Sequence, residues 1–345
     1  MIIILDNIIQ FINTVEEEMK KKGTRKWKVI GFSILGIFVL GIAAFGYEYY
    51  QLQPKHHFST VPVVGAKNSS NSSSADEKVD VKTPVFNVLL IGSDQRKGDK
   101  LGHTDSMVLV HVDLKNHKYQ AVSIPRDTRV HLDGYGYTKL TSVQYIKQAT
   151  DGSQKGIEAA VTAISEFMGV PINYYVETDY WGFQSMVDSL GGIKMDVPFD
   201  VKLTHPWYAE NKNKLISKGT YSFDGKMVTE VVHERYSLKN GEYGRQQLQE
   251  EALKGIAKKA LSPSNITKLP ALVKTIPDFI VATNMSTSDM LSLGLSAKNF
   301  EPKTQLVYQQ IRGEGKKLYD DILKANNYQI VINQEQVKDI AVKFQ

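Results

Sequence analysis

Residues 85–92 read VFNVLLIG, a run of branched apolar side chains that is typical of a buried strand. Three similar runs follow: SMVLVHVDL at 106–114, KYQAVSIP at 118–125 and NYYVETD at 173–179. Between the last two runs, apolar residues recur at helical spacing over 157–167, which predicts a helix that packs on the sheet. Strands that alternate with helices indicate a layered α/β domain.

Two more helices are predicted further along the chain. Phe183–Leu190 ends at the glycine pair 191–192, and Arg245–Leu261 ends before Pro263. Neither an internal repeat nor a second linker follows Val85, so we interpret residues 85–345 as one domain.

The composition is that of a globular protein, with 42% hydrophobic and 23% charged residues among 345. The net charge of +5 is modest, and much of it lies before residue 30. Such a local patch, without a zinc-finger or RNP-type motif, argues against nucleic-acid binding. The chain has no cysteine, which excludes disulfides, thiolate metal sites and a cysteine nucleophile.

Residues 29–47 form an uncharged apolar segment, VIGFSILGIFVLGIAAFGY, whose helical length nearly matches a bilayer core of about 30 Å. A buried soluble helix and a cleaved signal peptide are the alternatives to a transmembrane helix. Basic residues precede the segment and Glu48 follows it, so the positive-inside rule places residues 1–28 in the cytoplasm. The rest of the chain is then extracellular, on a single-pass protein of the cell membrane. Residues 48–84 contain NSSNSSSADEK and are predicted to be a Ser/Asn-rich linker.

Charged and polar side chains gather where the predicted strands begin or end. One such charge is usually a solvated turn, but ligands of α/β sheets are also held at strand ends. The candidates are Asp94, His103, Asp105, Arg126 with Asp127, Lys139, His233, Arg235, Arg245 and Gln249.

Several blocks resemble, in order, those of the LytR-CpsA-Psr family of membrane-anchored enzymes of bacterial cell-envelope assembly. These blocks are NVLLIGSD, TDSMVLVHVD, VSIPRDT, YYVETDYWGFQSMVDSLGGIKMDVP and YGRQQLQ, which together cover roughly residues 85–255. The resemblance implies a three-layer α/β/α sandwich with a central mixed sheet. It also implies a phosphotransferase that moves an anionic glycopolymer from a polyprenyl-pyrophosphate carrier to a peptidoglycan hydroxyl.

The family pattern assigns roles to the candidate residues. Arg126, Arg235 and Arg245 would bind the pyrophosphate, because guanidinium groups bind phosphate oxygens bidentately. Gln249 and Lys139 would assist, and Asp127 would orient Arg126 through an ion pair. The implied cofactor is Mg²⁺, which would lie between Asp94, Asp105 and the diphosphate. Either aspartate could act as the base, so the predicted catalytic residues are Asp94, Asp105 and Arg126.

Three positions depart from the family pattern. His103 and His233 stand where the family usually has arginine, and Leu248 stands where many members have a basic residue. Each change removes a permanent positive charge, although either histidine could bind pyrophosphate when protonated.

Some alternatives stay open at this point. The apolar helical residues at 157–168 and 183–190 could line a tunnel for the isoprenoid or could be ordinary core. The protein could also be a non-catalytic assembly or regulatory protein that binds the lipid-linked polymer, or a polyprenyl-pyrophosphate pyrophosphatase. The sequence does not distinguish teichoic acid, capsule and exopolysaccharide as the polymer.

Overall fold

The computed structural model describes residues 46–64, 78–81, 84–96 and 98–345. The chain divides into two compact units, Met1–His56 and His57–Gln345. The predicted cytoplasmic segment and nearly all of the predicted span at 29–47 lie outside the described residues. Within the described part, no helix is both long enough and apolar enough to cross a membrane.

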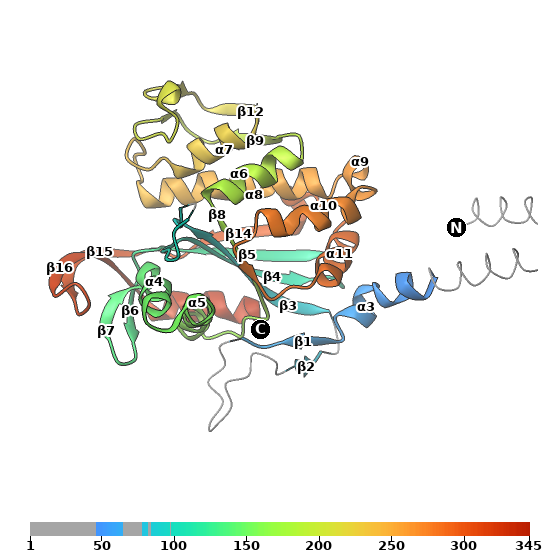
Figure 1. Cartoon of the computed structure of the whole chain (residues 1–345), viewed down its shortest axis with the longest axis horizontal. Helices are drawn as coiled ribbons and strands as arrows, with labels where there is room; N and C mark the ends of the chain where they lie inside the picture. The colour runs from blue at the N-terminus through green and yellow to red at the C-terminus, as the bar shows by residue number, and fades with distance from the viewer. Residues whose placement is uncertain (1–45, 65–77, 82–83, 97) are drawn as a thin grey trace, which may run out of the picture. The chain divides into compact units, whose positions relative to one another are not determined.

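The second unit is built around a six-stranded mixed sheet (Figure 1). Across the sheet the strands are β13 (Ala282–Thr283), β8 (Tyr174–Asp179), β3 (Val85–Ser93), β4 (Thr104–Asp113), β5 (Lys118–Ile124) and β14 (Leu306–Gln310). β4 is antiparallel to β3 and to β5, whereas β8 is parallel to β3 and β14 is parallel to β5. The four strands predicted from the sequence are thus confirmed as β8, β3, β4 and β5, the four inner strands of the sheet.

Alternation along β3 sends apolar side chains to both faces of the sheet. Leu89 and Ile91 point into one core cluster, whereas Val88 and Leu90 point to the other face. Strands covered on both sides read as continuous apolar runs, which explains the VFNVLLIG pattern.

Helices α4 (Leu140–Asp151), α5 (Ser153–Met168) and α13 (Gln334–Ala341) cover the first face. The helix predicted over 157–167 is confirmed as part of α5. Its residues Ile157, Val161 and Ile164 are at most 2% exposed and pack in this core. The alternative reading of this helix, a wall of an isoprenoid tunnel, is therefore wrong.

The second face is covered by α8 (Glu242–Ala260), α10 (Leu269–Thr275) and α11 (Thr287–Ser296) (Figure 1). Beyond them, α6 (Tyr180–Ser189) and α7 (Gly225–His233) pack with β9 (Ile193–Val197) and β12 (Gly219–Phe223) around a separate apolar cluster. Helices on both faces of a central mixed sheet make the layered α/β arrangement that was predicted. Both remaining predicted helices are confirmed, as α6 and α8.

Residues before Val85 also belong to the folded unit. Phe58 and Val61 are 1% and 2% exposed and pack against β3 and β4. β1 (Thr60–Pro62) pairs antiparallel with β2 (Lys78–Asp80), so the Ser/Asn-rich tract connects two paired strands. The segment predicted as a linker, residues 48–84, therefore contains parts of the domain core.

Two hairpins pack against each other beside the sheet: β6 (Arg129–Leu132) with β7 (Gly136–Lys139), and β15 (Gly313–Asp320) with β16 (Ala325–Ile332). Arg129 donates to the Tyr319 carbonyl at 2.9 Å and to Gln329 Oε1 at 2.5 Å. Arg129 thus holds the hairpins together. The remaining short α-helices and strands are α3 (Pro54–His57), α9 (Pro263–Ile266), α12 (Pro302–Gln305), β10 (Val201–Lys202) and β11 (Leu215–Ile216).

Candidate functional site

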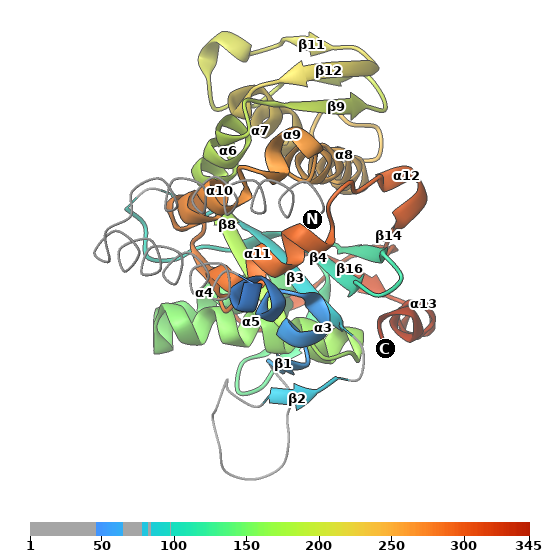
Figure 2. The ribbon, with the colours of Figure 1, turned by 90° about the vertical axis from the view of Figure 1, so that its right-hand side faces the viewer.

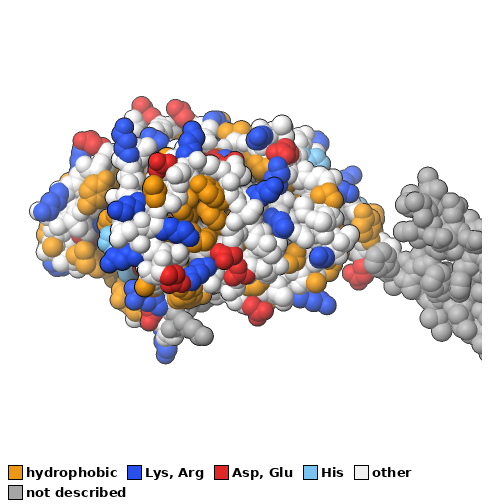
Figure 3. All heavy atoms as spheres, turned by 90° about the horizontal axis from the view of Figure 1, so that it is seen from above, with side chains coloured by type: hydrophobic (Ala, Val, Ile, Leu, Met, Phe, Trp, Pro, Cys, Tyr) orange, Lys and Arg blue, Asp and Glu red, His pale blue; other side chains and the backbone are white. Residues whose placement is uncertain are grey.

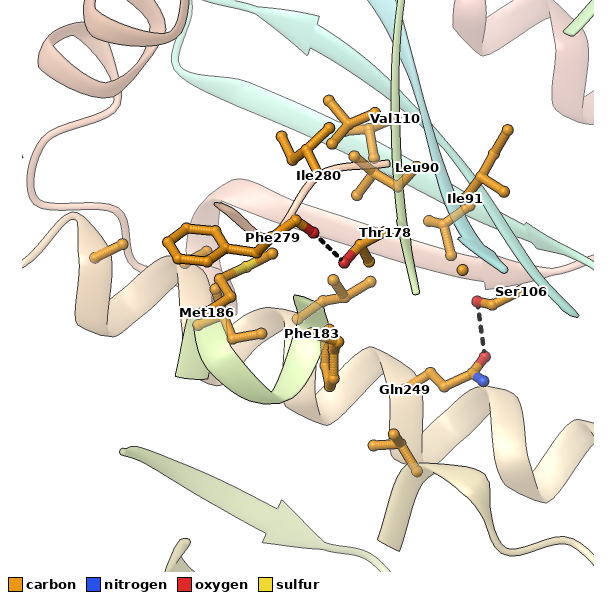
Figure 4. A pocket seen from close by; sticks show the side chains of 18 of the residues that line it. Leu90, Ile91, Ser106, Val110, Thr178, Phe183, Met186, Gln249, Phe279 and Ile280 are labelled. Carbon is orange, nitrogen blue, oxygen red and sulfur yellow. Dashed lines mark hydrogen bonds between the residues drawn. The ribbon is translucent and has the colours of Figure 1, made fainter. Parts of the chain in front are cut away.

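A cavity of about 610 Å³ lies between the second face of the sheet and the helices above it. Leu90 and Val110 from the strands face Phe183 and Met186 from α6 across this space (Figure 4). Further lining residues are mainly apolar and come from α8, α10 and α11. The predicted alternative that the 183–190 segment lines an apolar tunnel fits this arrangement.

One end of the cavity is polar. Asp94, Asp105, Arg245 and Gln249 line the cavity there, at the ends of β3 and β4 and in the first turns of α8. The Ser106 hydroxyl donates to Gln249 Oε1 at 3.1 Å, which fixes the amide at this end (Figure 4).

A smaller cleft of about 80 Å³ adjoins this polar end. Asp105, His233 and Arg245 line both spaces. The other residues of the cleft are Arg126, His205, Glu234, Arg235 and Tyr236. An apolar cavity and a cation-lined cleft therefore meet at shared residues.

Arg245 is almost completely buried, with 3% of its surface exposed. Its Nη2 donates to the Asp105 carbonyl at 2.7 Å and to Glu242 Oε1 at 2.9 Å. Its Nε is buried and has no hydrogen-bond partner among the described residues. A buried cation with a spare donor is suited to an anionic ligand, because an unmet donor is costly in the absence of one.

Arg126 follows β5 in a turn at residues 125–128 and donates through Nη1 to Asp105 Oδ1. The predicted ion pair of Asp127 with Arg126 is present but long: Arg126 Nε lies 3.9 Å from Asp127 Oδ1, beyond hydrogen-bond distance. Asp127 also accepts a hydrogen bond from Lys139 Nζ at 2.8 Å, the shorter of its two ion pairs. Lys139 therefore does not line the cleft and contacts Asp127 behind it.

His103 and Asp94 form a pair at the start of β4. The His103 backbone N–H donates to Asp94 Oδ1 at 2.6 Å, and His103 Nδ1 lies 3.2 Å from Asp94 Oδ2. The imidazole stacks on Tyr145 with ring centres 4.5 Å apart. Burial by itself would raise the pKa of Asp94, but the hydrogen bonds from His103 and the charge of Arg126 lower it below its usual range.

His233 ends α7, and Arg235 lies two residues beyond it. Between them the buried Glu234 accepts backbone N–H groups from Thr204 at 2.6 Å and Ser237 at 3.0 Å, which fixes this corner. The pKa of His233 lies below its usual value, first because surrounding protein atoms disfavour its charged form and second because Arg245 repels it.

Among the described residues, no group of three or more His, Cys, Asp or Glu side chains could hold a metal ion. The predicted Mg²⁺ would need only Asp94 and Asp105 from the protein, because Mg²⁺ commonly takes one or two carboxylates and fills its shell with phosphate oxygens and water. The donor set fits such a site. Both carboxylates already face cationic or protonatable partners, His103 and Arg126.

The family model of the LytR_cpsA_psr family matches residues 58–344. The chain belongs to the LytR_cpsA_psr family. It is 29% identical over 303 residues to the polyisoprenyl-teichoic acid–peptidoglycan teichoic acid transferase TagU of Bacillus licheniformis, covering 88% of this chain and 90% of the relative. The TagU of Bacillus cereus is 30% identical over 294 residues, covering 84% and 88%. The crystal structure of Bacillus subtilis TagV matches with a TM-score of 0.62 and 26% identity, covering 75% of this chain and 96% of TagV.

The LytR_cpsA_psr domain brings most of the predicted site residues together. Seven of them line the cavity or the cleft: Asp94, Asp105, Arg126, His233, Arg235, Arg245 and Gln249. His103 and Lys139 lie behind this lining: His103 contacts Asp94, and Lys139 contacts Asp127, which forms the long ion pair with Arg126. Leu248 is completely buried in the cluster around β9, so it faces away from the site.

Three features of this LytR_cpsA_psr site have no counterpart among the predicted residues. His205 and Tyr236 line the cleft, with ring centres 4.6 Å apart. Trp207 lines the cavity beside His233 and under the Arg96 guanidinium, 5.3 Å from its ring centre. All three lining residues, and also Arg96 after the end of β3, lie in irregular segments, where residue spacing carries no structural signal.

Proposed function

We propose that this protein is a membrane-anchored phosphotransferase that moves an anionic glycopolymer from a polyprenyl-pyrophosphate carrier to peptidoglycan. The observation that carries the proposal is the junction of an apolar cavity with a cation-lined cleft at Asp105, His233 and Arg245. A polyprenyl diphosphate has the same two parts, a long apolar chain and a dense anionic head. The names of the TagU relatives specify a polyisoprenyl-linked teichoic acid and a peptidoglycan acceptor.

Arginine side chains would bind the diphosphate. Arg126 and Arg245 each have a buried Nε without a hydrogen-bond partner among the described residues, and Arg235 faces the same cleft. Charge-assisted bonds of this kind are about twice as strong as neutral ones. Gln249 would assist from the cavity side, and Lys139 would act indirectly by holding Asp127.

The proposed reaction exchanges one phosphorus–oxygen bond for another. The oxygen of the acceptor hydroxyl attacks the phosphorus that carries the glycopolymer, and the bond from that phosphorus to the bridging oxygen breaks. Polyprenyl monophosphate leaves, and the hydroxyl proton passes to Asp94 or Asp105. The lowered pKa of Asp94 keeps that carboxylate ionised and able to accept a proton at neutral pH. Mg²⁺, bound by Asp94, Asp105 and the diphosphate, would stabilise negative charge on the leaving phosphate.

Two histidines would modulate this site. His233 lines both spaces, and the lowering of its pKa makes it neutral near neutral pH when no anion is bound. A bound diphosphate favours the imidazolium form and so raises this pKa. His103 would act on the site through Asp94.

The anchor and its orientation are part of the proposal. The uncharged segment at 29–47 would span the cell membrane once, with the folded unit outside, because basic residues cluster on its N-terminal side. This arrangement would bring the domain to both the carrier lipid and peptidoglycan.

The test incubates the full-length protein with a fluorescent lipid-linked donor and peptidoglycan. We expect the label to become covalently attached to peptidoglycan. Release of soluble label would indicate a pyrophosphatase, and retention on the protein alone would indicate a binding protein; either result would overturn the proposal.

A matched pair of variants gives this assay its control. Asp105 and Asp113 lie at opposite ends of β4, and Asp113 bonds the neighbouring turn near the surface, mainly through Asn116. Asp105→Asn should abolish transfer, whereas Asp113→Asn should leave it unchanged.

A further inference from the structure

One end of the domain carries lysines that have no ion-pair partner. Lys259, Lys268, Lys274 and Lys298, here called the lysine end, form no ion pair with any described residue, whereas nearby Lys258 pairs with Glu301 at 3.2 Å. The four come from the last turn of α8, from α10 and its start, and from the residue after the C-cap of α11.

Helices α9, α10 and α11 gather at this end of the molecule in both ribbon views (Figures 1 and 2). A hydrogen bond of 3.1 Å from the Asn299 N–H to the Leu261 carbonyl joins the end of α11 to the end of α8. The lysine end is therefore one surface, although its members are spread over 40 residues of sequence.

The same helices form part of the wall of the apolar cavity. Leu272 and Ile276 from the α10 segment, and Met290 and Leu293 from α11, all line it. Figure 3 shows hydrophobic side chains exposed beside Lys and Arg side chains on the neighbouring upper face. An apolar chain in the cavity thus lies directly beneath the lysine end.

The start of the folded unit is attached at this end. His57 Nε2 lies 2.8 Å from Asp289 Oδ1, in the first turn of α11. Only residues 48–56 separate His57 from the end of the predicted span, and nine residues reach at most about 30 Å even when fully extended. A chain anchored at residue 47 therefore keeps α11 close to the bilayer.

We propose that the lysine end docks on an anionic phospholipid surface and that the polyprenyl chain enters the cavity there. The inference rests on the proposed function for the identity of the lipid and for the anchor. Charge complementarity selects the partner, because the four lysines form no ion pair with any described carboxylate. The adjoining apolar residues, and the short segment 48–56 here called the tether, favour a membrane over a soluble polyanion as the partner.

The test uses the full-length protein reconstituted in vesicles, one set containing phosphatidylglycerol and one set of phosphatidylcholine alone. Because the chain has no cysteine, Thr275→Cys at the exposed end of α10 can be labelled alone with a fluorophore. Ser217→Cys, exposed between β11 and β12, provides the reference position. We expect a lipid-borne quencher to quench the label at 275 strongly and the label at 217 weakly, in the anionic vesicles only.

Charge variants test the lysines themselves. A lysine beside an anionic membrane contributes about 1 kcal/mol, roughly a fivefold factor. Lys268→Gln with Lys274→Gln should therefore lower the ratio of docked to undocked protein by roughly 25-fold, and salt should do the same by screening. The control double change Lys212→Gln, Lys218→Gln alters the net charge equally and should have no effect.

Equal quenching at both positions, or insensitivity to the Lys268 and Lys274 changes, would overturn the proposal. Loss of docking on adding a soluble anionic glycan, with no dependence on lipid charge, would assign the lysines to a polymer instead. The readout requires neither donor lipid nor acceptor. A protein that docks but transfers nothing would contradict only the proposed function.

Discussion

The buried pair of Arg245 and Glu242 separates a structural role from a binding role. Their side chains are 4% and 15% exposed, and Nη2 lies 2.9 Å from Oε1. Arg245→Met leaves the Glu242 carboxylate buried without its cation, and loss of one partner of a buried pair costs about 3–5 kcal/mol. Since domains have roughly 5–15 kcal/mol of stability, the variant should remain folded but unfold at clearly lower urea.

The double change Arg245→Met, Glu242→Gln removes both charges. Its stability should return to within about 1–2 kcal/mol of the wild type, because no buried charge is then left unpaired. Affinity for a diphosphate should stay low in both variants, by roughly tenfold to a hundredfold, since a charge-assisted bond contributes about 1.5–3 kcal/mol.

Two assays on the full chain in detergent measure these effects. Tryptophan fluorescence during urea unfolding gives stability, and calorimetric titration with farnesyl pyrophosphate gives affinity. The exposed Arg312, which bonds Gln310 at 2.9 Å, supplies the control change Arg312→Gln, expected to alter neither. Wild-type affinity in the double variant would refute the binding role of Arg245, and wild-type stability in the single variant would refute the electrostatic argument.

Three further outcomes are expected. Burial raises the pKa of Glu177, so folding favours its protonated form. The unfolding free energy should therefore fall as pH rises from the usual glutamate range through this raised pKa. Glu177→Gln should remove that part of the decline when urea unfolding is compared between pH 4 and pH 8. Diphosphate affinity should fall as pH rises through the titration of ligand-bound His233. The double change His103→Arg, His233→Arg should flatten this pH profile between about pH 5 and 8, and an equally flat wild-type profile would exclude histidine protonation as a contribution to binding. Protease added to intact protoplasts should remove the folded unit after residue 54, and protection of that unit would reverse the predicted orientation.

The strands and long helices could be predicted because their patterns are local. Alternation in β3 and the helical spacing of Ile157, Val161 and Ile164 follow directly from backbone geometry. The same patterns cannot tell a core from a cavity wall, since both are apolar. Met186 and Val161 have similar helical contexts in sequence, yet one lines the cavity and the other is core.

Most of the predicted charged residues come together, but the sequence did not indicate which of their contacts are short. Arg126 and Asp127 are neighbours in sequence and form a long ion pair of 3.9 Å, but the turn at 125–128 gives each a shorter partner elsewhere, Asp105 and Lys139. His205 could not be anticipated, because it reaches the cleft from an irregular segment between β10 and β11 that is far in sequence from Arg126. Contacts of this kind depend on tertiary packing, which residue spacing does not encode.

The pairing of β1 with β2 makes the Ser/Asn-rich tract a natural place for changes of chain length. Val61 lies opposite Val79, so the two ends of the tract are held together by the strand pair. The entropic cost of closing a loop grows only with the logarithm of its length, about 0.6 kcal/mol for each doubling. An epitope or a small fluorescent module inserted between β1 and β2 would therefore not lengthen residues 48–56. It would label the protein without a fusion at either terminus.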